Sequence, residues 1–146
     1  MDAWEIAARE CVRNTYASYN HAGDRFRIAD LTACFAENGV LEIKGGAVAT
    51  GRAEIVELLT GSRSENPSWV PQIRHFIANV VFTSVTPTGI ESAAYFQVLT
   101  QRGLDHWGRY RDALVPVDGD WLLAHRLVAV DSAVDGAWYD GPVSGR

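Results

Sequence analysis

The sequence lacks any apolar run of roughly 18 residues, the length at which a transmembrane helix is expected. Its first residues, Met1–Glu5, are acidic and amphipathic, unlike the basic and then apolar start of a signal peptide. We therefore expect no membrane partner and a cytoplasmic location.

Positive charge is also scarce. The chain has 13 Lys and Arg residues against 18 Asp and Glu residues, which gives a net charge of −5, and Lys44 is its only lysine. The basic residues form no cluster that could bind phosphates, so we expect no nucleic-acid partner.

Only two cysteines are present, Cys11 and Cys34, each in a helical pattern and without the spacing of metal ligands. We interpret them as small buried apolar residues in a reducing compartment, with a disulfide between the two helices as the alternative. The sequence also lacks a phosphate-binding loop, a dinucleotide fingerprint and a metal-binding histidine motif. We therefore expect neither a metal nor an organic cofactor.

The composition that remains is that of an ordinary globular domain. The chain has 146 residues, of which 47% are apolar and 21% charged, and this length is typical of one domain. We expect that domain to span residues 1–131. A glycine-rich tail, residues 132–146, carries Trp138 and Tyr139, and it either covers a pocket or is partly disordered.

Helical patterns occupy most of the first half. Apolar residues at spacings of three and four predict an amphipathic helix over 3–21 and a second over about 25–36. Gly51 and Gly61 bracket a third short helix, with Gly61 at the position of a C-terminal glycine.

Strand patterns dominate the second half. Val40–Ile43 and Ala47–Thr50 predict a small hairpin, and the polar stretch 62–71, which contains Trp69, predicts a loop. Four longer strands are then expected at 74–84, 90–101, 106–116 and 121–130. Helices followed by antiparallel strands indicate an α+β fold, in which three helices pack on a strongly curved, mostly antiparallel sheet. Such a cone-shaped α+β barrel would hold a pocket at its wide end.

His75 opens a strongly strand-forming run. Period-2 alternation would place it on one face with Ile77, Asn79 and Val81. An imidazole that faces an interior needs a hydrogen-bond partner or performs chemistry. We take Asp24 as its candidate partner. The alternatives are that Asp24 only caps the second helix and that His75 is a structural core histidine.

Several segments, in this order and spacing, resemble the nuclear transport factor 2-like superfamily and its polyketide cyclase (SnoaL)-like branch. They are Tyr19–Asp24, Phe35–Val40, Gly51–Ile55, Arg74–Asn79, Gly108–Asp112, Asp118–Trp121 and Arg126. The resemblance extends to about residue 131. It implies the cone fold, a small-molecule substrate and a homo-oligomer, with a dimer expected and a trimer as the next choice.

The same resemblance suggests site residues. Scytalone dehydratase, bile-acid 7α-dehydratase and hexachlorocyclohexane dehydrochlorinase share a layout with an Asp after the first helix and a His at the start of the first long strand. Carried over, these positions are Asp24 and His75, with Tyr19 and His106 as further catalytic candidates. We expect substrate contacts from Tyr16, Trp69, Asn79, Trp107, Tyr110 and Arg126, of which Arg126 competes with Arg109 and Arg111 for the role of the family arginine.

A His–Asp pair suits proton abstraction beside a leaving group, because the carboxylate stabilises the imidazolium that forms. The leading hypothesis is a cofactor-independent lyase or isomerase of the dehydratase type, acting on a small apolar cyclic substrate. The alternatives are a polyketide-type cyclase, an epoxide hydrolase or a non-catalytic ligand-binding module, since this fold hosts all of them.

Overall fold

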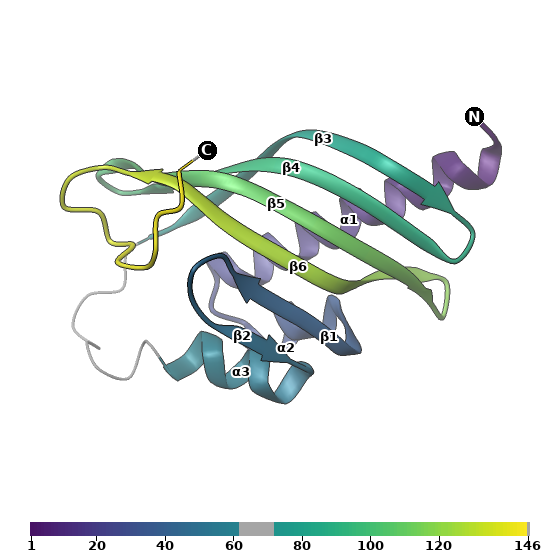
Figure 1. The fold of residues 1–146 in the computed structure, drawn as a ribbon, viewed down its shortest axis with the longest axis horizontal. Helices are drawn as coiled ribbons and strands as arrows, with labels where there is room; N and C mark the ends of the chain where they lie inside the picture. Colours follow the sequence, from purple (N-terminus) through teal and green to yellow (C-terminus); the bar gives the residue numbers. More distant parts are fainter. Residues whose placement is uncertain (62–71, 146) are drawn as a thin grey trace.

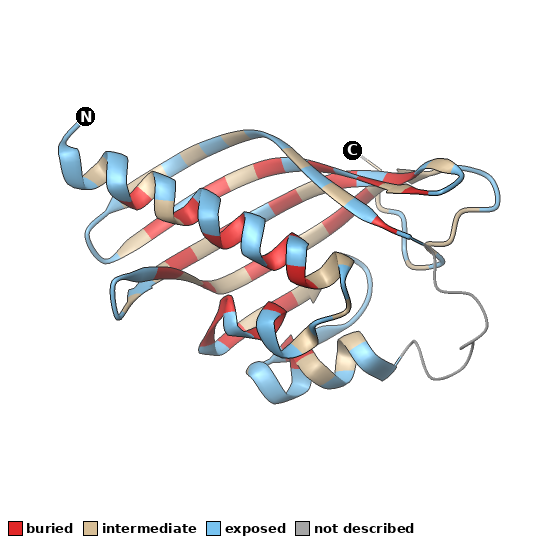
Figure 2. Cartoon of the chain, turned by 180° about the vertical axis from the view of Figure 1, so that it is seen from behind, coloured by how far each residue is buried: buried red, intermediate tan, exposed pale blue. Residues whose placement is uncertain are grey.

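A computed structural model of the protein describes residues 1–61 and 72–145. Helix α1 (Ala3–Asp24) begins with a capping interaction, in which the Asp2 backbone N–H donates to Glu5 Oε2 at 2.8 Å. The helix lies across one face of the sheet and turns a stripe of buried residues toward it (Figures 1 and 2). It ends at Asp24, three residues later than predicted, so Asp24 does not cap the second helix, whose N-cap is Arg27.

The second helix is shorter than the predicted 25–36. Helix α2 covers Ile28–Ala33, and strand β1 (Phe35–Ile43) follows almost at once, so the prediction was wrong at both ends. Phe26 has a positive φ of 56°, which interrupts the helical path before α2. At the other end, the Leu123 backbone N–H donates to the Cys34 carbonyl at 2.9 Å, and the fully buried Phe35 pairs with Leu123. Burial of Phe35 against another strand overrides the local helical preference.

The remaining elements agree closely with the predicted order. Strand β2 (Val48–Thr50) pairs antiparallel with β1, and helix α3 (Arg52–Gly61) follows it. Four long strands complete the chain, namely β3 (Arg74–Thr86), β4 (Gly89–Thr100), β5 (Gly103–Val117) and β6 (Asp120–Ala133).

The six strands form one open sheet in the order β2-β1-β6-β5-β4-β3 (Figure 1). Only the β1–β6 pairing among these strands is parallel. Three helices on a mostly antiparallel sheet confirm the predicted α+β fold. Among the described residues, no helix combines the length and the apolar character that a membrane span needs.

Two of the β-bulges in this sheet redirect side chains of predicted site residues or their neighbours. In β3, Ala78 pairs with Tyr95 and Val81 with Ala93, so β3 has one extra residue, and Asn79 there takes a positive φ of 53°. In β5, His106 pairs with Val98 and Leu104 with Leu99, which leaves Asp105 as the extra residue. Beyond each bulge, the residues that face the core are therefore offset by one position from strict alternation.

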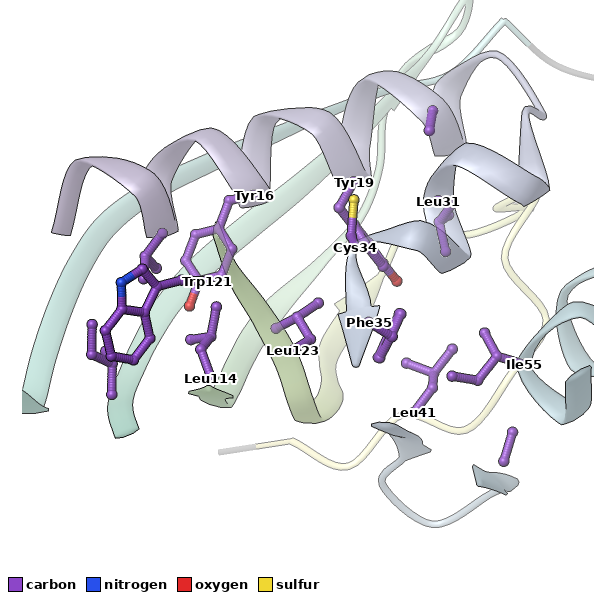
Figure 3. Packing of buried hydrophobic residues seen from close by; sticks show 14 of the residues in the cluster. Tyr16, Tyr19, Leu31, Cys34, Phe35, Leu41, Ile55, Leu114, Trp121 and Leu123 are labelled. Atoms are coloured by element: carbon purple, nitrogen blue, oxygen red, sulfur yellow. The ribbon is translucent and has the colours of Figure 1, made fainter. Parts of the chain in front are cut away.

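The main core lies between α1, α2, α3 and the sheet. Figure 3 shows Tyr16 and Tyr19 reaching from α1 toward Leu114, Leu123 and Phe35. A second cluster, which we call the aromatic cluster, is built on the buried residues Ile73, Phe96, Val98, Tyr110 and Val130, and Trp138 and Tyr139 of the tail pack against it.

Candidate active site

Asp24 and His75 are in direct contact. The last turn of α1 presents Asp24, and β3 presents His75 as its second residue. His75 Nδ1 lies 2.6 Å from Asp24 Oδ1, and the His75 backbone N–H donates to both carboxylate oxygens at 3.2 Å. Since a carboxylate only accepts hydrogen bonds, it holds the imidazole in the Nδ1–H tautomer and leaves Nε2 as a free base.

The Asp24–His75 pair is mostly buried but stays partly accessible from outside. The Asp24 side chain is 7% exposed and the His75 side chain 21%. Both line a groove of about 640 Å³ between α1 and the edge strand β3, together with Tyr16, Ile77 and Asn79. A small molecule in this groove can therefore reach the imidazole.

Asn79 does not share the inward face of His75. The bulge in β3 leaves Asn79 and Val81 exposed, whereas Ile77 and Val80 pack against the core. The predicted strict alternation along this strand was wrong beyond Ile77. Asn79 nevertheless lines the groove, because its backbone turns at the sheet edge.

His106 forms a second histidine–aspartate pair. Its Nδ1 lies 2.8 Å from Oδ2 of the neighbouring Asp105, and both residues are buried. The imidazole packs on the aromatic cluster, with ring centroids 4.5 Å from Tyr139 and 6.0 Å from Phe96. Burial lowers the pKa of His106, although the hydrogen bond and charge of the Asp105 carboxylate oppose the shift.

This pKa shift predicts an acid-sensitive fold. The unfolded chain takes up the His106 proton at an ordinary pKa of about 6.5, whereas the folded chain resists protonation, so acidification favours unfolding. We expect the free energy of unfolding to fall as the pH drops below about 6.5. Urea denaturation at several pH values checks this, and His106→Gln should flatten the dependence. An equal slope in both proteins would contradict it.

Tyr16, Tyr19 and Tyr110 surround a buried cation. Arg126 is fully buried, and its guanidinium lies 4.9, 4.3 and 4.0 Å from the ring centroids of these tyrosines. Burial raises the pKa of the Tyr19 hydroxyl, so this group stays protonated and can donate a hydrogen bond. Figure 3 shows that the Tyr19 side chain extends into the main core beside Phe35.

Arg126 is held by Asp112. Its Nε and Nη2 donate to the two Asp112 oxygens, each at 2.8 Å, and both side chains are completely buried. Asp112 keeps the pKa of Arg126 well above its ordinary value although burial opposes this. Since the pair lies within the core, we interpret Arg126 as a structural cation under the tyrosines.

One predicted contact residue lies elsewhere, and another falls outside the described residues. Trp107 is on the opposite face of the sheet from His106 and lines a separate hollow with Phe76, Tyr95 and Gln97. It is therefore not among the residues gathered around His75. Trp69 lies outside the described residues.

Among residues 1–61 and 72–145, no three His, Cys, Asp or Glu side chains gather as a metal site would require. Cys11 and Cys34 are free thiols, and burial raises the pKa of Cys34 to about 11. This thiol is therefore a poor nucleophile at neutral pH.

The family to which the chain belongs follows from a comparison of its sequence with known families. The SnoaL-like domain family matches residues 4–127. The chain belongs to the SnoaL-like family. No curated protein matches it by sequence.

Solved structures with this SnoaL-like fold include one from Novosphingobium aromaticivorans that is provisionally assigned as a scytalone dehydratase. It is 19% identical over 96% of this chain and 93% of that chain, with a TM-score of 0.80. A protein from Catenulispora acidiphila, solved in complex with S-DNPA, is 28% identical over 86% and 95% of the two chains, with a TM-score of 0.74. ActVI-ORFA from Streptomyces coelicolor is 24% identical over 86% and 96%, with a TM-score of 0.72.

Sequence reasoning missed Asp105 and Asp112 in this SnoaL-like domain. Asp112 precedes its partner Arg126 by fourteen residues across the β5–β6 hairpin, and the turn at Asp118–Asp120 could have suggested that the two are opposite each other. Asp105 could not have been found in this way, because strict alternation places it on the other face from His106.

Proposed function

We propose that this SnoaL-like protein is a cofactor-independent lyase or isomerase of the dehydratase type, with His75 as its general base. The observation that carries the proposal is the 2.6 Å contact between His75 Nδ1 and Asp24 Oδ1 in a groove large enough for a small cyclic molecule. A base oriented in this way by a carboxylate is the arrangement that proton abstraction requires.

In the proposed dehydration, His75 Nε2 takes a proton from the carbon beside a carbonyl. The C–H electron pair forms the new double bond, the C–O bond breaks, and the leaving hydroxide takes a proton to depart as water. Because burial keeps His106 neutral, we assign delivery of that proton to the His75 imidazolium, which predicts elimination on one face of the substrate. Isomerisation would begin with the same abstraction and return the proton to another carbon.

The substrate we propose is a small, largely apolar cyclic ketone with a hydroxyl group on the β-carbon. Tyr16, Ile77 and Val80 supply an apolar lining to the groove. Tyr19 is not among the residues that line it, because its side chain extends into the main core. The complex of the Catenulispora acidiphila relative with S-DNPA supports a small-molecule ligand. A homodimer remains our prediction for the assembly.

Wild-type protein incubated in D₂O with a panel of cyclic β-hydroxy ketones tests the function. For at least one compound, we expect either deuterium at the carbon beside the carbonyl or loss of water. NMR and mass spectrometry measure both outcomes. Panel compounds that bind the groove, as seen in the shifts of His75 signals, but neither exchange nor lose water would contradict the proposal. The chain would then be a ligand-binding module.

A polyketide-type cyclase using Asp24 alone is less well supported. Both Asp24 oxygens already accept hydrogen bonds from His75, so the carboxylate is committed to orienting the imidazole. Epoxide hydrolysis by an Asp–Arg–Asp cluster is also less well supported, because Arg126 and Asp112 are completely buried.

A further inference from the structure

One carboxylate, that of Asp105, holds the first part of the tail after β6. Trp138 donates its backbone N–H to Asp105 Oδ1 at 2.7 Å, and Tyr139 donates its own to Oδ2 at 3.2 Å. The Val134 N–H donates to the Asp105 carbonyl at 2.9 Å. Asp105 therefore binds both ends of the tail segment Val134–Tyr139.

The same carboxylate also binds His106. Asp105 Oδ2 accepts from His106 Nδ1 at 2.8 Å while it accepts from Tyr139, whose ring stacks on the imidazole 4.5 Å away. The β5 bulge makes this arrangement achievable, because it turns Asp105 and His106, which are neighbours in sequence, into the same interior. Three donors thus converge on one buried side chain.

We propose that Asp105 is a positioning residue that fixes the Nδ1–H tautomer of His106 and, with the same two oxygens, docks the tail against that imidazole. His106 orientation and tail docking then depend on each other. His106 Nε2 is then left as a hydrogen-bond acceptor. The tautomer and the docked tail are properties of the free protein, so neither depends on the proposed function.

The asparagine variant separates these roles, because Asp105→Asn keeps the shape and replaces one acceptor oxygen with an NH₂ donor. The new side chain cannot accept from His106, Trp138 and Tyr139 as the carboxylate does. Asp135→Asn is the matched control, since it removes the same charge from an exposed position in the same tail.

Two measurements on the full chain test the proposal without any substrate. Long-range ¹H–¹⁵N NMR of the histidine rings, assigned with His106→Gln, reports the tautomer, and amide hydrogen exchange reports the docking of residues 134–139. In Asp105→Asn we expect His106 to shift toward the Nε2–H tautomer and the Trp138 and Tyr139 amides to exchange at least about tenfold faster. Asp135→Asn should match the wild type in both.

A changed tautomer with an unchanged tail, or a loosened tail with an unchanged tautomer, would overturn the proposal. If Asp105→Asn does not fold, Tyr139→Leu replaces it, because that variant keeps the backbone donor and removes the stacked ring together with the hydroxyl that donates to the Pro142 carbonyl. We expect faster tail exchange and a His106 tautomer shifted toward Nε2–H there, and a wild-type His106 tautomer beside a loosened tail would also overturn the proposal. Failure of the proposed reaction would leave all of these readouts intact.

Discussion

Replacing Asp24 by asparagine is expected to lower the rate of substrate proton abstraction by about two to four orders of magnitude. Asp24 contacts His75 Nδ1 at 2.6 Å, so in the proposed reaction it fixes the Nδ1–H tautomer and faces the positive charge that the ring gains. An amide can hydrogen-bond His75 but cannot stabilise the imidazolium in the same way. The measurement is kcat and kcat/KM on a compound from the ketone panel.

Asp30→Asn is the matched control for this prediction. Asp30 also lies near the α1–α2 connection and pairs with Arg27, but its side chain is 63% exposed. We expect wild-type kinetics from it. An Asp24→Asn protein that keeps its fold by circular dichroism and at least a tenth of the wild-type rate would contradict the assigned role.

Replacing Arg126 by leucine is expected to lower the free energy of unfolding by about 3–5 kcal/mol, because the Asp112 carboxylate would be left buried and uncompensated. Three tyrosine rings around the guanidinium would lose their cation as well. Urea denaturation followed by tryptophan fluorescence measures the change.

Two companion variants make this stability prediction specific. Arg126→Leu combined with Asp112→Leu should recover much of the loss, since no unpaired charge remains. Arg27→Leu, which removes an exposed pair with Asp30, should cost less than about 1 kcal/mol. A loss as large in the double variant as in Arg126→Leu would mean that packing, not charge, dominates this part of the core.

Local patterns predicted the fold where burial and periodicity agree. The four long strands and α1 have strong periodicity, and their predicted positions differ from the structure by only a few residues. The helix predicted for the segment after Cys34 was wrong, because Phe35 has helical spacing but pairs with Leu123, which lies far along the chain. No local signal encodes that contact.

The site was predicted where it follows the alternation of a strand and missed where a bulge breaks it. His75 lies before the β3 bulge, so its inward direction could be inferred, and the resemblance supplied Asp24 as its partner. Asn79 lies at that bulge, and Asp105 at the one in β5. A single extra residue moves side chains to the other face, and the sequence does not mark where it occurs.

Deuterium incorporation by His75→Gln, compared with His125→Gln, tests the central claim most directly. His125 is a matched control because it also bonds a carboxylate, Glu42 Oε2 at 2.9 Å, but on the outer face of the sheet and with a 41% exposed side chain. With an exchanging ketone in D₂O, we predict that His75→Gln loses at least about 100-fold in exchange rate, while His125→Gln matches the wild type. Wild-type exchange by a folded His75→Gln protein would contradict the assignment of His75 as the base.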